Sequence, residues 1–600
     1  MKNKYHILSN NYNNWSIFSL FAFSIFIKCV FFHYACFNYV AVSSLWQAPL
    51  EFLAFYFAKL LPALFFASFV FLFKRQWWTI VASVIIDLWL IANALYYRQC
   101  SLFIDIDVIK MAGNLNGFMS SILTYINWKA FVFVAITALY CGTLVFFEKR
   151  NEQLIPKTSV KGFIVAFVTS FLLVVYDFTL GYGSNIMYTN KNKEWFDINQ
   201  FQWGRKVAKG KSLYSNLQRP NIVERGTVFH YFPCLFIYEL SLDRNREVEY
   251  SQREIEILSE IVSDEKQIQL SGNLIFILVE SFENWALNMR DLKGDEVTPN
   301  INAFRSKHSH LFCTKIKSQT RNGGSGDGQM IENSGMLPLN SGAACMLYGK
   351  NRYPNYAHFW SNSTIIDPCA NDIWNQPMMT KCYEYSDIFP NSKNGQTGTE
   401  DDAVVFQYAI QRLEKLKIEP FCMHVITMSM HAPFTRVDCP SMKWPNDMPS
   451  NLRNYLNAVH YTDSAIAPFL EKLEYDSLLT NTTIAITGDH TTFSHNMLME
   501  YASFVDEHGY PIPTEISYCP LIVCSPNIKE NIEVNERCFQ MDIFPTILHC
   551  IGADDYYWKG FGVNLLDSAA RHNRKITEDE AYILSDKMIR SDYFRGLVSN

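Results

Sequence analysis

Apolar residues dominate the chain as far as about residue 180, and polar residues become frequent only beyond that point. Five stretches in the first part are apolar over about 20 residues, the length that crosses a bilayer as a helix. They cover residues 15–37, 51–73, 78–97, 128–147 and 162–180. Every peptide group in lipid must be hydrogen-bonded within its own segment, so each stretch is expected to be helical. The pattern predicts a five-helix transmembrane domain over residues 1–180, in preference to buried helices of a soluble core.

Lysine and arginine are distributed unevenly among the loops between these stretches. They occur before the first stretch, after the second and after the fourth, whereas residues 38–49 contain none and 98–127 very few. Positive residues remain on the cytoplasmic side of a membrane. The N-terminus is therefore predicted to be cytoplasmic in a multi-pass protein of the cell (inner) membrane. An odd number of spans then places everything after residue 180 outside, in a periplasm or at an open cell surface.

Two ionisable residues interrupt the apolar stretches. Lys28 lies within the first stretch and Asp87 within the third. A lysine in such a position can extend along the helix toward the membrane interface, which is the expectation for Lys28. Asp87 is expected to pair inside the bundle. The alternative for both residues is a polar path across the bilayer.

The second part of the chain begins with a mixed polar and aromatic segment, 181–267, which is predicted to be a linker or stalk ending in an amphipathic helix at 248–266. From 268 to 567, short apolar runs alternate with helical patterns. The apolar runs are 274–279, 422–428, 483–487 and 520–524, and the helical patterns are 403–416, 452–473 and 542–551. This alternation predicts an α/β domain with a mostly parallel sheet covered on both faces. Residues 568–600 are expected to form a C-terminal tail.

Composition narrows the possible partners. The formal net charge is −6 and the sequence shows no basic stripe, so nucleic acid is not an expected partner. Most of the 15 cysteines lie beyond residue 180, where an oxidising compartment can join them in disulfides. The sequence does not determine their pairing.

Polar residues with chemical potential follow three of the predicted strands. Glu280 follows the first strand, Asp489 and His490 follow the third, and His431 comes after the second. Ligands of parallel α/β sheets bind beyond the carboxyl ends of the strands. Two carboxylates and an imidazole at neighbouring strand ends suit a divalent cation such as Mn²⁺, Mg²⁺ or Zn²⁺. Taken singly, each residue has an ordinary alternative as a helix cap, a loop residue or a core histidine.

A glycine-rich segment, residues 321–329, precedes another predicted helix and contains Ser325. Its glycines permit close backbone approach, and the N-terminus of the helix would attract an anion. A serine beside a metal ion can lose its proton and attack phosphorus. The segment lacks the lysine of a P-loop, and Asp327 replaces the second glycine of a nucleophile elbow. The local alternative is a flexible turn in which Ser325 only caps the helix.

The ordered series of these pieces resembles the alkaline phosphatase and sulfatase superfamily, and most closely its lipoteichoic acid synthase branch of membrane phosphoglycerol transferases. The matching segments are 273–282, 298–300, 323–339, 400–402, 428–434, 461–463, 488–490, 520–522 and 542–546. The resemblance covers both parts of the chain. It implies a membrane anchor followed by an extracytoplasmic sulfatase-like catalytic domain.

The resemblance also implies a set of site residues. It assigns one divalent cation, in the first place Mn²⁺, to Glu280, Ser325, Asp489 and His490. Ser325 stands where the family has a threonine nucleophile, and His431 matches a histidine that contacts the substrate and serves catalysis. Trp360 is similar to a tryptophan lining the substrate pocket. The family often has an arginine where Asn362 stands, and Arg321 or Arg352 would have to replace its charge at the substrate.

The implied function is transfer of a phosphoglycerol-type headgroup from a membrane phospholipid to a glycan or glycolipid, through a covalent intermediate on Ser325. Within the superfamily the alternatives are a phosphoethanolamine transferase, a phosphodiesterase and a sulfatase. A sulfatase is disfavoured because the residues after Ser325 lack the motif that is converted to formylglycine. An inactive membrane sensor or scaffold is the alternative from another class of protein, although all four implied metal ligands are present.

Overall fold

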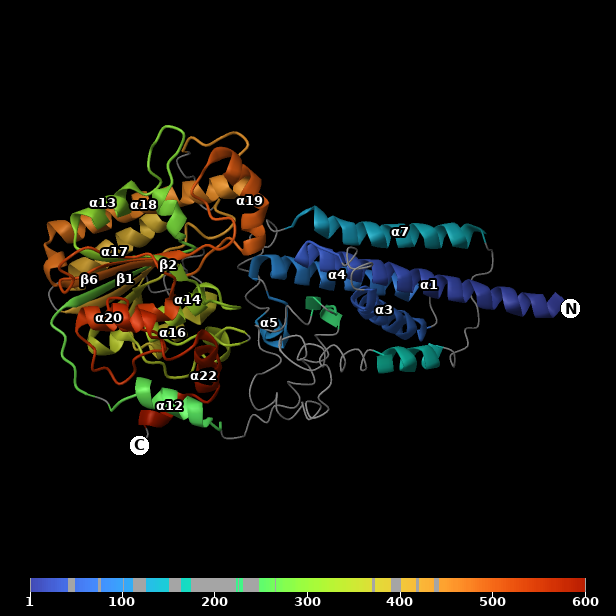
Figure 1. Cartoon of the computed structure of the whole chain (residues 1–600), viewed down its shortest axis with the longest axis horizontal. Coiled ribbons are helices and arrows are strands. Elements are labelled where there is room, and N and C mark those ends of the chain that lie inside the picture. The colour runs from blue at the N-terminus through green and yellow to red at the C-terminus, as the bar shows by residue number, and fades with distance from the viewer. Residues whose placement is uncertain are drawn as a thin grey trace. The chain divides into compact units, whose positions relative to one another are not determined.

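The chain forms two compact units in the computed structural model (Figure 1). The membrane unit comprises residues 1–109 and 122–244, and the α/β unit comprises 110–121 and 245–600. The structure describes residues 2–40, 49–73, 77–100, 102–111, 126–150, 163–173, 223–224, 226–229, 248–264, 266–340, 342–368, 373–389, 401–416, 420–435 and 442–598. Most of the predicted stalk and the end of the fifth predicted span lie outside the described residues.

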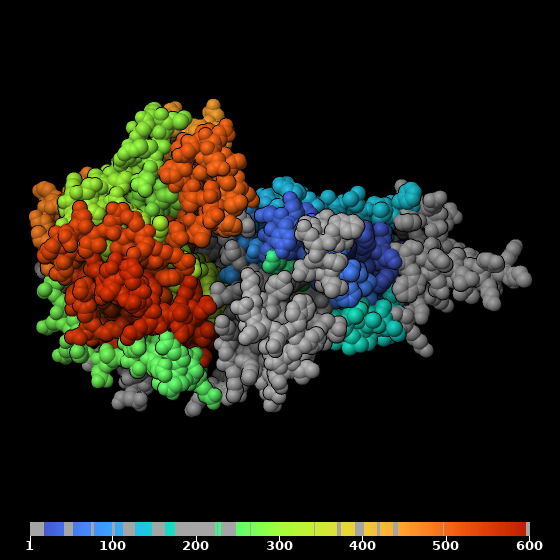
Figure 2. Space-filling model, viewed as in Figure 1, coloured from blue at the N-terminus to red at the C-terminus, as the bar shows by residue number. Residues whose placement is uncertain are grey.

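The membrane unit is helical, as the apolar pattern predicts. Its helices are α1 (Lys2–Phe37), α3 (Pro49–Phe71), α4 (Trp77–Cys100) and α7 (Trp128–Arg150), while the short α5 (Ile106–Lys110) joins the two units. Apolar side chains such as Phe131 and Leu139 are 66% and 71% exposed on α7, the cyan helix that reaches the surface in Figure 2. An apolar surface of this kind suits contact with lipid.

The predicted count of five spans requires correction. Among the described residues, three helical segments are long and apolar enough to cross a membrane: Ile17–Phe37, Trp77–Arg98 and Trp128–Phe146. The second and fifth predicted spans coincide with the shorter apolar helices Phe55–Phe71 and Phe163–Leu173. At about 1.5 Å per residue, the described part of the fifth span covers only about half of a hydrocarbon core.

Lys28 does not extend to the membrane interface as expected but is fully buried in the membrane unit. Its ammonium lies 2.7 Å from Asp87 Oδ1 and donates hydrogen bonds to Thr137 Oγ1 at 2.7 Å and to the Ser83 carbonyl at 3.3 Å. Thr137 also donates to Asp87 Oδ2. These residues belong to α1, α4 and α7, so one polar cluster joins three helices. Pairing was expected for Asp87, and Lys28 is the partner.

The α/β unit is built on one mixed, mostly parallel sheet. Its strands are β1 (Asn273–Val279), β2 (His310–Lys317), β3 (Asn362–Ile366), β4 (Asp387–Phe389), β5 (Phe421–Ile426), β6 (Thr482–Gly488), β7 (Cys519–Cys524), β8 (Ile532–Val534) and β9 (Cys538–Phe539). The order is β4-β3-β5-β1-β6-β7-β2-β8, with β9 beside β2. Strands β4 to β6 in this order are parallel, whereas β7 runs antiparallel to both its neighbours. The four predicted strands correspond to β1, β5, β6 and β7, whose residues are all buried.

Helices cover both faces of the sheet. They are α12 (Gln252–Ile261), α13 (Pro299–Lys307), α14 (Ser325–Ser334), α15 (Ala344–Leu347), α16 (Gln376–Cys382), α17 (Asp402–Leu416), α18 (Ser450–Tyr475), α19 (His495–His508), α20 (Ile543–Ile551), α21 (Ser568–His572), α22 (Glu578–Arg590) and α23 (Tyr593–Val598). Figure 1 shows α13, α17 and α18 above the sheet and α14, α16 and α20 below it. The three predicted helical patterns correspond to α17, α18 and α20.

The ends of the α/β unit are joined to each other. Helix α12 buries Ile257, Leu258 and Ile261 in the main core, which also contains Leu584 and Met588 of α22. Both oxygens of Glu254 accept hydrogen bonds from Lys587, at 2.6 and 2.7 Å. Part of the segment predicted as a stalk and most of that predicted as a tail therefore pack with the sheet.

The described cysteines of the α/β unit differ from the expectation of disulfides. All eight are free, and all but Cys382 are buried. Their thiols lie among apolar side chains of the core, where a free cysteine behaves as a small hydrophobic residue. Cys234, Cys369 and Cys439 lie outside the described residues.

Candidate metal and nucleophile site

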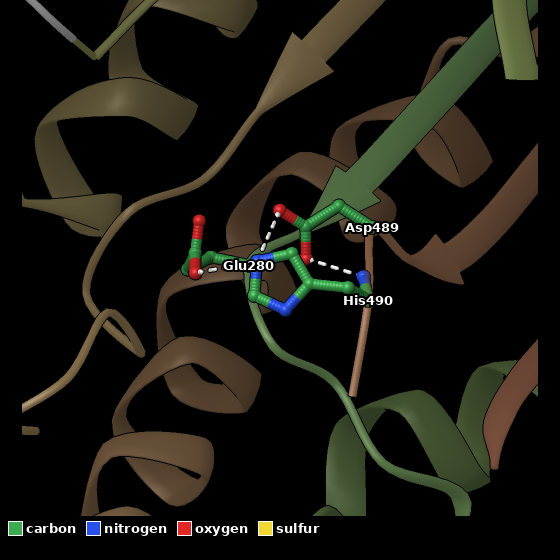
Figure 3. A group of neighbouring side chains, drawn as sticks. All are labelled: Glu280, Asp489 and His490. Atoms are coloured by element: carbon green, nitrogen blue, oxygen red, sulfur yellow. Dashed lines mark hydrogen bonds and ion pairs between the residues drawn. The ribbon is translucent and has the colours of Figure 1, made fainter. Parts of the chain in front are cut away.

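The parallel pairing of β1 with β6 places two carboxylates side by side. Val279, the last residue of β1, lies opposite Gly488, the last residue of β6. The next residues, Glu280 and Asp489, therefore leave the same edge of the sheet, and His490 follows Asp489. Figure 3 shows the imidazole of His490 lying between the two carboxylates. This confirms the proximity predicted from the strand ends.

The distances in this cluster are those of a compact polar site. His490 Nε2 lies 3.6 Å from Glu280 Oε1 and 3.5 Å from Asp489 Oδ2. One ligand atom of each residue can be chosen so that all three lie within 4.8 Å of one another. Glu280 and Asp489 are only 3% and 2% exposed. Water therefore has little access to either carboxylate.

Ser325 contacts this cluster from helix α14. It is the first residue of α14, and its Oγ donates a hydrogen bond to Glu280 Oε2 at 3.0 Å and lies 3.3 Å from His490 Nε2. Gly324 precedes it with φ of 47°, a left-handed conformation that glycine adopts without strain. The hydroxyl thus stands at a helix N-terminus, where the positive end of the helix dipole favours an anion. The backbone N–H groups of Gly326, Asp327 and Gly328 already donate to the carbonyls of Gly323 and Gly324.

Close packing fixes the glycine-rich segment. A side chain at Gly328 would meet the Asp489 carbonyl oxygen at 2.6 Å, so α14 approaches the Asp489–His490 turn as closely as backbone allows. Asp327 Oδ2 accepts hydrogen bonds from the backbone N–H groups of Arg321 and Gly323, both at 2.9 Å. Hydrogen bonds and close packing therefore fix the conformation of this loop, which is not a flexible turn.

His431 lies near enough to act on Glu280 electrostatically. Its loop is anchored by Asp402 of α17, whose Oδ1 accepts hydrogen bonds from the backbone N–H groups of Met428 at 2.7 Å and Ser429 at 2.9 Å. His431 Nδ1 lies 2.8 Å from the Ala432 carbonyl oxygen. The Nδ1 atom of His431 is therefore hydrogen-bonded to the backbone of the next residue.

The pKa values of the cluster reflect an excess of negative charge. Burial acts to raise the pKa of Glu280, but the neighbouring His431 and His490 outweigh it and lower that pKa. Burial and repulsion by Glu280 raise the pKa of Asp489 to about 7. Burial opposes the charged form of His490, yet Asp489 and Glu280 raise its pKa above the ordinary value. Two carboxylates and one imidazole share a space that water hardly reaches.

Three residues expected at the substrate are placed elsewhere or are otherwise engaged. Trp360 donates from Nε1 to the Gly272 carbonyl at 2.9 Å, which puts it at the amino end of β1, opposite to the end that carries Glu280. The expectation that Trp360 lines the substrate site is wrong for this reason. Arg352 pairs with Glu384 at 3.1 Å. Arg321 lies over the Tyr582 ring and donates to Asn340 Oδ1 at 2.6 Å.

A different tryptophan lies at the site. A side chain at Gly326 would meet Trp374 Cδ2 at 3.3 Å, and one at Gly324 would meet Trp374 Cζ2 at 3.7 Å and His490 Nε2 at 4.0 Å. The ring of Trp374 therefore lies against the glycines on either side of Ser325. Trp374 lies in none of the matching segments that carry the family resemblance. Its aromatic character was the only available signal.

The donor set fits a divalent cation. Two carboxylates, an imidazole and a hydroxyl converge, and burial together with the neighbouring Glu280 raises the pKa of Asp489. A positive ion would relieve the repulsion by Glu280, and oxygen and imidazole ligands suit Mn²⁺, Mg²⁺ or Zn²⁺.

Comparison with known proteins identifies both parts of the chain. Residues 1–194 match the model of the lipoteichoic acid synthase N-terminal domain, and residues 346–553 match the sulfatase model. Lipoteichoic acid synthase from Staphylococcus saprophyticus is 22% identical over 532 residues, which are 85% of this chain and 79% of that protein. The chain is a lipoteichoic acid synthase-like protein of the sulfatase superfamily. The sulfatase match contains His431, Asp489 and His490, whereas Glu280 and Ser325 precede it.

Solved structures provide a further point of reference for this lipoteichoic acid synthase-like protein. A lipoteichoic acid synthase from Listeria monocytogenes is 18% identical with a TM-score of 0.46, covering 58% of this chain and 98% of that one. The phosphoethanolamine transferase from Neisseria meningitidis, an integral membrane protein, is 13% identical with a TM-score of 0.45 over 89% of this chain and 95% of that one.

Proposed function

We propose that this protein transfers a phosphoglycerol-type headgroup from a membrane phospholipid to a glycan or glycolipid, with Ser325 as the nucleophile. One observation carries the proposal. The Ser325 hydroxyl lies 3.0 Å from Glu280 Oε2 and 3.3 Å from His490 Nε2 at the N-terminus of α14. A hydroxyl among groups that can accept its proton, at a helix end that favours anions, is arranged for attack on phosphorus.

The reaction consists of two displacements. In the first, Ser325 Oγ forms a bond to phosphorus, the bond from phosphorus to the glyceride oxygen breaks, and diacylglycerol leaves with a proton. In the second, an acceptor hydroxyl attacks the phosphoserine, and the serine oxygen is released. Glu280 takes the Ser325 proton along the existing hydrogen bond in the first displacement and returns it to the serine oxygen in the second. His431 gives a proton to the leaving glyceride oxygen and then takes the proton of the acceptor hydroxyl. The positive end of the α14 dipole favours the negative charge on the phosphoryl oxygens.

Glu280, Ser325, Asp489 and His490 are the residues that would hold one divalent cation, with Mn²⁺ the first candidate. Such an ion supplies positive charge that stabilises a deprotonated serine and the phosphoryl oxygens. Trp374 forms an apolar wall beside Ser325, in the role that Trp360 does not fill.

The membrane unit supports the choice of a lipid donor. Its apolar helices would keep the α/β unit beside the bilayer, with the N-terminus in the cytoplasm and residues 268–567 as the catalytic domain outside it. Curated relatives along most of the chain bear the name lipoteichoic acid synthase. The name of these relatives favours phosphatidylglycerol as the donor and an envelope glycolipid as the acceptor.

The test uses full-length protein in vesicles that contain labelled phosphatidylglycerol or labelled phosphatidylethanolamine, with Mn²⁺ present. We expect diacylglycerol to be released from phosphatidylglycerol, and mass spectrometry of an acid-quenched sample to show glycerophosphate on the peptide containing Ser325. Release from phosphatidylethanolamine alone would make the protein a phosphoethanolamine transferase. Release of glycerophosphate to water, with no transfer to glycolipid, would make it a phosphodiesterase. Cleavage of a sulfate ester and of neither lipid would overturn the proposal.

A further inference from the structure

Ser281 occupies an unusual turn beside the site. It follows Glu280 directly, is 1% exposed, and has φ of 55°. A left-handed conformation is costly for a residue with a side chain and persists only where surrounding contacts impose it. Such a conformation next to a functional residue suggests a purpose in the site.

The contacts of Ser281 reach both carboxylates of the cluster. Its backbone N–H donates to Asp489 Oδ1 at 2.7 Å, and its hydroxyl donates to Glu280 Oε1 at 2.8 Å. Asp489 Oδ1 accepts a second hydrogen bond from the His490 backbone N–H at 2.8 Å. Each carboxylate therefore has one oxygen engaged by Ser281. The other oxygens, Glu280 Oε2 and Asp489 Oδ2, face Ser325 and the His490 imidazole respectively.

Neighbouring elements hold this turn in place. Tyr455 of α18 donates from its hydroxyl to the Ser281 carbonyl at 3.0 Å and accepts from the Glu283 backbone N–H, also at 3.0 Å. On the other side, a side chain at Gly488 would meet the Phe282 carbonyl oxygen at 2.4 Å. The end of β6 can therefore approach the turn only because residue 488 is glycine. The conformation of Ser281 is fixed by contacts outside the carboxylates.

We propose that Ser281 is a positioning residue that holds Glu280 and Asp489 so that each presents a single oxygen to the cation. The inference rests on the proposed function, because it assigns the cation to these carboxylates. Ligand atoms of the two carboxylates lie within 4.8 Å of each other, so their negative charges repel. Without the hydrogen bond from Ser281 to its Oε1, Glu280 would turn away from Asp489 or offer both of its oxygens to the cation. Hydrogen bonds that orient ligands contribute to metal affinity, typically by about 10- to 100-fold for one partner.

The test measures metal binding and not catalysis. Metal-free full-length protein in detergent is titrated with Mn²⁺ by calorimetry, and the bound ion is examined by electron paramagnetic resonance. Ser281→Ala removes the hydroxyl and keeps the backbone N–H. Ser281→Gly also removes the hydroxyl but adopts a φ of 55° without strain. Ser585→Ala is the matched control, because Ser585 is fully buried and donates to the Leu337 carbonyl at 2.5 Å.

Both Ser281 variants are expected to bind Mn²⁺ about 10- to 100-fold more weakly than the wild type and to show an altered resonance line shape. Ser585→Ala is expected to keep the affinity and the line shape, even if its melting temperature falls. Should Ser281→Ala not fold, Ser281→Gly still gives the measurement. Wild-type affinity in a folded Ser281 variant would overturn the role of Ser281 and leave the proposed function standing. A wild-type protein that binds no divalent cation would overturn both.

Discussion

The membrane unit and the α/β unit each contain a buried cluster of charged side chains, and the two clusters are built differently. In the membrane cluster, the Lys28 ammonium has three partners, namely Asp87, Thr137 and the Ser83 carbonyl, and one positive charge faces one negative charge. The cluster of Glu280, Asp489 and His490 is called the catalytic cluster here after its proposed role. In it, two carboxylates face one imidazole. The first cluster pairs one charge with one opposite charge, whereas the second brings two carboxylates close enough for Glu280 to raise the pKa of Asp489.

This difference separates a structural role from a functional one. A buried ion pair with satisfied donors joins helices and fixes how they pack, and it offers nothing to a ligand. A buried group of like charges is unfavourable by itself and becomes favourable when a cation binds. The membrane cluster should therefore govern folding, and the catalytic cluster should govern binding and activity.

The largest expected effect is on catalysis. Ser325→Ala removes the attacking oxygen from the catalytic cluster, and lipid turnover should fall by about 10³-fold or more, because the proposed intermediate is a bond from that oxygen to phosphorus. Release of labelled diacylglycerol measures the loss. Ser334→Ala, at the other end of α14, is the control, since its hydroxyl donates within the helix to the Met330 carbonyl at 2.5 Å. Turnover close to that of wild type in Ser325→Ala would disprove the assignment.

The next effect concerns the stability of the membrane cluster. Lys28→Met leaves the buried Asp87 without its counter-ion, which should lower the free energy of unfolding by about 3–5 kcal/mol. In the double variant Lys28→Met/Asp87→Leu no charge remains, and most of this loss should be recovered. Unfolding in mixed micelles, followed by tryptophan fluorescence, compares the two. A double variant as unstable as the single one would show that the pair is not a balanced structural unit.

A smaller effect distinguishes the clusters by their response to a metal ion. Mn²⁺ at about 100 times its Kd should stabilise the folded protein by about 2.7 kcal/mol. Asp489→Asn should abolish most of this gain, because it removes a charged ligand. The Lys28→Met/Asp87→Leu variant should retain all of it. Thermal unfolding with Mn²⁺ or with a chelator measures the difference, and a gain that survives in Asp489→Asn would place the ion elsewhere.

The smallest effect comes from a buried group outside both clusters. Burial in β5 lowers the pKa of His424 from its ordinary value of 6.5 to about 3. Between about pH 6.5 and pH 3, His424 is therefore protonated in the unfolded chain and neutral in the folded chain. The contribution of His424 is complete above pH 6.5 and is lost as the pH falls, by at most about 1.4 kcal/mol per pH unit. In His424→Gln the acid dependence of metal-free protein should be shallower by one proton, and an unchanged slope would contradict this.

The catalytic cluster was predictable because its geometry follows from the sheet. Apolar runs show where β1 and β6 end, and parallel strands end at one edge, so Glu280, Asp489 and His490 had to be neighbours. Ser325 could be placed beside them only through the family resemblance. The choice of Trp360 failed because its indole hydrogen-bonds at the amino end of β1, whereas the Trp374 ring lies against the glycines beside Ser325. No periodic pattern in the sequence distinguishes these two tryptophans.

The membrane cluster was only half predictable. Hydropathy identifies apolar segments and the unusual charges within them, but it contains no information on how helices rotate about their axes. Whether Lys28 reaches the interface or Asp87 depends on that rotation. The number of spans was wrong because the apolar parts of the second and fifth predicted spans, Phe55–Phe71 and Phe163–Leu173, are shorter among the described residues than a membrane span.

The described part of the α/β unit contains seven buried thiols, and their chemical labelling can report on its folded state. A membrane-impermeant maleimide can modify them only when the sheet opens, so the rate of labelling follows native-state opening rather than surface accessibility. Replacing Cys234, Cys369, Cys382 and Cys439 by serine would restrict the signal beyond residue 180 to these seven buried thiols. Pulse labelling in whole cells, read as a mass shift for each peptide, would then show which strands separate first while the protein remains in its own membrane.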